Sequence, residues 1–102
     1  MGTKNNPGSY DCYVNAEPDE PMFVLLARDQ LAGFLVSIWS KVRLGDVEAA
    51  SAVFVKMLHE VGPRYMQEPD IDKANEAIEC SLAMFRWRKE NRPLPANQTG
   101  GD

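Results

Sequence analysis

The segment Met22–Leu44, MFVLLARDQLAGFLVSIWSKVRL, is the most apolar part of the chain and decides the predicted fold. From Gln30 onward its apolar residues recur at helical spacing, which predicts a helix that stops at Gly45. The main apolar face contains Leu31, Phe34, Leu35, Ile38 and Val42. Further apolar residues lie off this face: Ala32, Val36 and Trp39. We therefore expect either two flanking helices or a second copy of the chain to cover this helix.

The first part of this segment, Met22–Ala27, is too short for periodicity to distinguish a helix from an extended piece. Pro21 disfavours a helical conformation just before it. We expect an extended run buried along the helices, with an early helical turn as the alternative. Asp29 is the predicted N-cap of the helix that follows, because its carboxylate can accept hydrogen bonds from free amides.

A second helix is predicted directly after the first. Asp46 is a favourable N-cap, and Gly62 with Pro63 is expected to end the helix, which leaves Arg64–Met66 in a connecting loop. Because Gly45 and Asp46 form a very short link, the first two helices should pack as an antiparallel hairpin.

A third helix is predicted after Pro69. Either Asp70 or Asp72 caps it, and both acids suit the positive end of the helix dipole. Apolar residues at helical spacing carry it to about Glu90, before Pro93 interrupts the pattern. Its apolar row contains Ile71, Ala74, Ile78, Leu82 and Phe85.

The predicted fold is mainly α: a small three-helix bundle with an extended N-terminal arm. The arm covers residues 1–21, the helical domain residues 22–92 and a disordered, polar tail residues 93–102. A periodic region of this size forms a marginal core by itself. We therefore expect a homo-oligomer that associates through the first helix.

Composition excludes several classes of protein. A net charge of −4 argues against general nucleic-acid binding, which needs a basic surface. No apolar run is long enough to span a membrane, and MGTKNNPGSY has no apolar signal region, so we expect no membrane association. Cys12 and Cys80 lie too far apart in the sequence to indicate a disulfide framework, and a cytoplasmic location is expected.

The motifs of catalysis and metal binding are missing from the sequence. His59 is the only histidine, and neither a CxxC pair nor a Gly-rich phosphate loop occurs. We therefore expect a protein that is not an enzyme, with no catalytic residue, metal or cofactor.

Candidate ligand-binding residues come from two regions. Tyr10 and Tyr13 either pack against the helices or stack on a ligand. Trp87 and Arg88 lie among basic residues at the end of the third helix, which either complement its dipole or bind an anion. Arg28 completes the predicted set, because arginines pair with phosphates while aromatic rings stack on bases.

The run NPGSYDCYVNAEPDEPMFVLLARDQLAGFLVSIW, from Asn6 to Trp39, resembles a group of small bacteriophage and prophage proteins. Their shared segment has the form NPGxYDCY followed by EPMFxLLxRD and an apolar helix with a tryptophan. The resemblance covers about a third of the chain and brings no assigned activity or site residues. It implies an accessory phage product in the cytoplasm of an infected bacterium.

Two functions follow from these expectations. The first is a small binding protein that antagonises a host antiphage defence system. It would bind either a host protein or a small anionic nucleotide signal, which it would sequester. The second is a phage structural or assembly accessory that acts only through protein–protein contacts.

Overall fold

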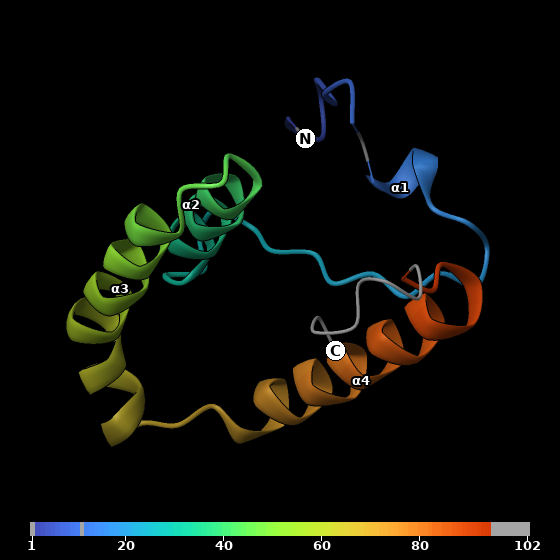
Figure 1. The fold of residues 1–102 in the computed structure, drawn as a ribbon. Helices are drawn as coiled ribbons and strands as arrows, with labels where there is room; N and C mark the ends of the chain where they lie inside the picture. The colour runs from blue at the N-terminus through green and yellow to red at the C-terminus, as the bar shows by residue number, and fades with distance from the viewer. Residues whose placement is uncertain (1, 11, 95–102) are drawn as a thin grey trace. The chain divides into compact units, whose positions relative to one another are not determined.

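A computed structural model describes residues 2–10 and 12–94 of the chain (Figure 1). Its helices are α1 (Cys12–Asn15), α2 (Ala32–Arg43), α3 (Val47–Gln67) and α4 (Ile71–Asn91). The described residues form no strand beyond an isolated antiparallel bridge between Gly2 and Pro7. The prediction of a mainly helical protein is therefore confirmed. The tail predicted for residues 93–102 lies, from residue 95 onward, outside the described residues.

The chain divides into two compact units. The first combines Met1–Phe23 with Asn75–Asp102, and the second is the continuous segment Val24–Ala74. The second unit therefore contains α2 and α3, whereas the first contains α1 and most of α4.

In the second unit, α2 begins slightly later than the sequence suggested. The carboxylate of Asp29 accepts a hydrogen bond from the amide of Leu31 at 2.8 Å. Leu31 occupies the N-cap position and makes no capping bond with its side chain. Asp29 therefore stabilises the turn before the helix. Its carboxylate bonds the amide of Leu31, the N-cap residue itself, so the assignment of Asp29 as the N-cap is wrong.

The link between α2 and α3 confirms the predicted hairpin. Gly45 has a φ of 79°, a left-handed conformation that glycine adopts without steric cost. The amide of Asp46 donates to the carbonyl of Lys41 at 2.9 Å, which closes the end of α2. The carboxylate of Asp46 accepts from the amide of Ala49 at 3.0 Å and caps α3 as predicted. With this tight link, α2 and α3 pack against each other.

The buried core of the described residues is small and lies in this hairpin. Ala50, Met57 and Val61 recur at helical spacing along α3, and each is 5–7% exposed. Ala32 at the start of α2 is 5% exposed. Small side chains at two of these four positions allow the two helices to approach closely.

The structure extends α3 beyond the predicted stop at Gly62 and Pro63. The helix continues to Gln67, so the prediction that Arg64–Met66 forms a loop is wrong. Pro63 removes one amide donor, but the later bond from the amide of Glu68 to the carbonyl of Arg64 shows that the helical pattern resumes. The helix ends just before Pro69, which disfavours a helical conformation at Glu68.

In the first unit, the N-terminal arm and Met22, which follows it, contact α4. The thiol of Cys80 donates to the carbonyl of Met22 at 3.4 Å. Arg92, just after α4, donates to the carboxylate of Glu17 at 2.7 Å. The stretch 21–26 is neither helix nor strand, which agrees with the expected extended run and not with the helical alternative, but Phe23 and Val24 are 48% and 63% exposed. The expected burial of this run is therefore wrong.

Candidate functional site

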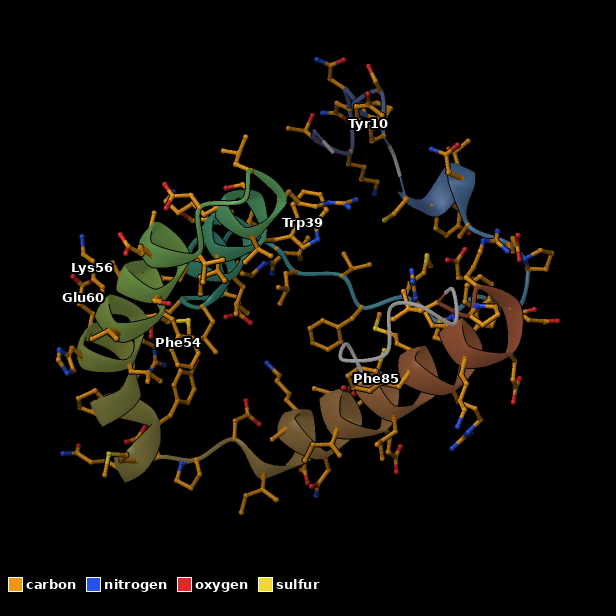
Figure 2. All side chains as sticks on the ribbon, in the orientation of Figure 1. Tyr10, Trp39, Phe54, Lys56, Glu60 and Phe85 are labelled. Carbon is orange, nitrogen blue, oxygen red and sulfur yellow. The ribbon has the colours of Figure 1, made fainter. Side chains whose placement is uncertain are left out.

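The hairpin of α2 and α3 leaves an apolar surface of α2 exposed. Val36 is 59% exposed and Trp39 is 54% exposed, and both lie on one helix face with Arg43, at i, i+3 and i+7. We call these three residues the α2 patch. Figure 2 shows Trp39 on the side of α2 that is turned away from α3. A large aromatic side chain is thus presented outward by a helix whose other side is packed.

The charge around Trp39 is positive and structurally organised. The guanidinium carbon of Arg43 lies 4.7 Å from the centroid of the Trp39 ring, within the range of a cation–π contact. Lys41 is the other charged residue of α2, which contains no acid. The whole chain carries a net charge of −4, so the α2 patch differs in sign from the chain as a whole.

Local hydrogen bonds support the geometry of this helix end. The ammonium of Lys41 donates to the hydroxyl of Ser37 at 3.0 Å, on another face of α2. The hydroxyl of Ser40 donates to the carbonyl of Ser37 at 2.7 Å. Both bonds lie in the last turns of α2, which also carry Trp39 and Arg43.

Tyr10 and Tyr13, predicted to contact a ligand, are the most exposed of the predicted aromatic residues. Their side chains are 74% and 79% exposed. Tyr13 lies in the single turn of α1, whereas Tyr10 precedes it. Neither ring is therefore buried, and stacking on a ligand stays a prediction.

Trp87 is already in contact with its own chain. Its ring is half-buried, and the guanidinium carbon of Arg92 lies 5.4 Å from its centroid. Arg92 also donates to Glu17, and this hydrogen bond raises the pKa of Arg92 above its ordinary value. A ligand that stacks on this side of Trp87 would have to displace Arg92. The neighbouring Arg88 is exposed.

The five predicted ligand residues do not form a single site within either unit. Arg28 is exposed in the turn before α2 and belongs to the second unit, whereas the other four belong to the first. Sequence reasoning also placed Trp39 off the main apolar face without pairing it with Arg43. The i, i+4 spacing of Trp39 and Arg43 could have indicated this contact from the sequence.

The described residues include neither a cluster of side chains that could hold a metal ion nor a helix that could span a membrane. No three His, Cys, Asp or Glu side chains among residues 2–10 and 12–94 are placed to hold a metal ion. In the same part of the chain, no helix has the length and apolar character needed to cross a bilayer. Cys12 and Cys80 are free thiols.

Comparisons with known proteins found no match to a family model, a curated protein or a solved structure. The candidate site must therefore be interpreted from its own residues. The α2 patch combines exposure, apolar area and a cation–π contact.

Proposed function

We propose that this chain is a non-enzymatic phage protein that binds a host protein through the α2 patch and so antagonises an antiphage defence system. The observation that carries this proposal is the exposed Trp39 ring with Arg43 stacked on it. Both residues project from a hairpin that has its own buried residues. The resemblance of Asn6–Trp39 to small phage proteins supports the setting in an infected bacterium.

The composition of the α2 patch suits a protein partner. Tryptophan and arginine are enriched among the residues that dominate binding energy at protein interfaces. The cation–π contact restrains both side chains before binding, which lowers the entropy lost when a partner immobilises them. Val36 extends the apolar area along the same helix face.

The patch also specifies the surface chemistry of the partner. An apolar pocket would receive Trp39, and a carboxylate at its rim would pair with Arg43. α2 has no acidic residue that would repel such a rim. The proposed partner surface is therefore an apolar depression with an acidic edge, on a host defence protein. In the alternative, a phage assembly protein offers the same surface.

A test uses Trp39→Ala and Arg43→Ala in bacteria that express the protein together with individual antiphage defence systems. We expect the wild-type chain to restore plaque formation against one system and both variants to lose this effect. Lys56→Ala is the matched control, because Lys56 lies on the outer face of α3 in an ion pair with Glu60 and should leave the effect unchanged (Figure 2).

Direct binding then separates contact from indirect effects. The purified defence component should bind the wild-type chain, and Trp39→Ala should raise the dissociation constant by about 30-fold, the size expected for a central aromatic contact. Equal binding by wild type and Trp39→Ala would contradict the proposal. Far-UV circular dichroism verifies that the variants keep their helices.

A nucleotide ligand is the second candidate, favoured by the exposure of Tyr10, Tyr13 and Arg88 in the first unit. Equilibrium dialysis against a panel of mono- and dinucleotides would detect it directly. Retention that is lost in Tyr13→Ala and Arg88→Ala, but kept in Trp39→Ala, would support sequestration over the protein partner.

Two finer predictions about architecture stay predictions. One is a bundle of α2, α3 and α4, and the other is self-association through α2. Self-association through α2 would compete with a host protein for the same exposed face. Comparing the oligomeric state of Trp39→Ala with that of the wild type separates self-association from host binding. A smaller oligomer for Trp39→Ala would indicate that the α2 patch joins copies of the chain.

A further inference from the structure

α4 has apolar residues on two opposite faces, and only one of them is covered within its unit. The half-buried residues of one face are Ala77, Cys80, Ala83, Met84 and Trp87. On this side the thiol of Cys80 donates to the carbonyl of Met22. The opposite face, which we call the α4 row, consists of Ile78, Leu82 and Phe85, at i, i+4 and i+7. Their exposed fractions are 56%, 56% and 71%.

The charges of α4 are separated along its length. The half from Ile71 to Ser81 has three acids and one base, whereas the half from Leu82 to Asn91 has three bases and one acid. The acids of the first half are Asp72, Glu76 and Glu79, and the bases of the second half are Arg86, Arg88 and Lys89. The helix is therefore complementary in charge to a reversed copy of itself.

We propose that the α4 row binds the α4 row of a second copy of the chain, in antiparallel orientation and centred near Leu82. In this orientation the acidic half of each helix lies beside the basic half of the other, and the two helix dipoles also oppose each other. A parallel pair would place like charges together, which is unfavourable. Charge complementarity therefore selects the occupant and its direction.

Helical spacing also gives the register of this pair. Glu79 and Arg86 lie seven residues apart on the same flank of the α4 row. When Leu82 faces Leu82 of the partner subunit, Glu79 lies near the partner's Arg86, and Ile78 lies near the partner's Phe85. Two ion pairs then flank a continuous apolar contact, as in antiparallel coiled coils.

This inference concerns a different helix from the α2 patch, so it does not depend on the proposed function. The competing arrangement is the predicted three-helix bundle, in which α2 and α3 of the same chain cover the α4 row. The two arrangements differ in whether Leu82 residues of separate chains meet, and that difference can be measured.

Disulfide cross-linking tests the orientation in a full-length Cys12→Ser/Cys80→Ala background. We expect Leu82→Cys to give a covalent dimer under a mild oxidant at low micromolar concentration. Ile71→Cys is the matched control on the same helix. It lies 11 residues from Leu82, or about 16 Å, so its copies would be about 33 Å apart in an antiparallel pair. Cross-linking of both variants, or of neither, would overturn the proposal.

Charge reversal tests the register. Glu79→Arg and Arg86→Glu should each weaken the dimer on the order of tenfold in sedimentation equilibrium, because each removes two ion pairs and creates like-charge contacts. The double variant Glu79→Arg/Arg86→Glu should return to within about threefold of wild type. Failure of the double variant to recover would refute the pairing. Glu60→Arg on α3 makes the same change in net charge as Glu79→Arg and should have less than a twofold effect.

A third test uses Leu82→Lys, a variant that should fold like the wild type and lose only the contact between copies. Leu82 is half exposed in the protomer, so a lysine at this position should not disrupt the helix. The far-UV circular dichroism spectrum of Leu82→Lys should therefore match that of the wild type. The expected product is a folded monomer. A Leu82→Lys protein that still dimerises with wild-type affinity would contradict the proposed surface.

Discussion

Arg92 donates to the carboxylate of Glu17 at 2.7 Å and so joins the end of α4 to the N-terminal arm, 75 residues earlier in the chain. The same guanidinium lies over the ring of Trp87. One arginine therefore makes a polar contact with the arm and a cation–π contact with the helix. Both groups of the ion pair are partly exposed, so this contact orders the arm and adds little stability.

Replacing Glu17 with alanine should loosen the arm while leaving α4 helical. We expect faster amide hydrogen exchange in residues 12–20 and unchanged exchange in the middle of α4, because only the arm loses a tether. Glu17→Gln keeps a weaker acceptor and should give an intermediate rate. Identical exchange in the arm of wild type and Glu17→Ala would show that this ion pair does not hold the arm.

Truncating Met57 should destabilise the α2–α3 hairpin strongly. Met57 is 6% exposed, so Met57→Ala leaves a cavity and should lower the free energy of unfolding by about 2–3 kcal/mol. The neighbouring Leu58 is 49% exposed, and Leu58→Ala should cost less than about 1 kcal/mol. Urea unfolding followed by circular dichroism measures both values. Similar losses for the two variants would contradict the assignment of the core.

Two glycines of the second unit should respond to alanine with opposite signs. Gly45 has a φ of 79° and Gly33 lies within α2, and an added Cβ meets no atom within 4 Å at either position. Gly45→Ala should therefore destabilise by about 1–2 kcal/mol through backbone strain alone. Gly33→Ala should stabilise by about 0.5–1 kcal/mol through higher helix propensity. Thermal unfolding of the two variants gives the comparison.

Removing the cap of α3 should fray its first turn. Asp46→Ala leaves the amide of Ala49 without its carboxylate partner and should cost about 1 kcal/mol. Asp46→Asn keeps an acceptor oxygen at the same position and should recover most of that loss. Equal stability of Asp46→Ala and wild type, measured by urea unfolding, would argue that this bond contributes nothing.

Sequence reasoning predicted local features well where one or two residues decide them. The stop at Gly45 and the cap at Asp46 follow from backbone freedom and a short side chain, which act within one turn. The end of α3 was wrong because two prolines compete for it. Pro63 lies within the helix, and Pro69 follows its end.

The candidate site was predicted only in part, because exposure depends on contacts between distant residues. Trp39 was recognised as apolar, but its exposure depends on how α2 packs on α3. Its contact with Arg43 lies within α2 and follows from their i, i+4 spacing, which the sequence already contains. By contrast, the ion pair of Arg92 with Glu17 joins residues 75 positions apart, and residue types alone do not assign it.

The amino-acid sequence by itself determined the helical class and the α2–α3 hairpin with Gly45 and Asp46 at its link, because these depend on periodicity and on bonds within a few residues. Tertiary structure alone decided which apolar faces are covered. Within its own unit, the Cys80 face of α4 meets Met22, whereas the Leu82 face is exposed, although both faces are apolar. The physical reason is that burial is a property of the partner surface, which helical spacing does not encode.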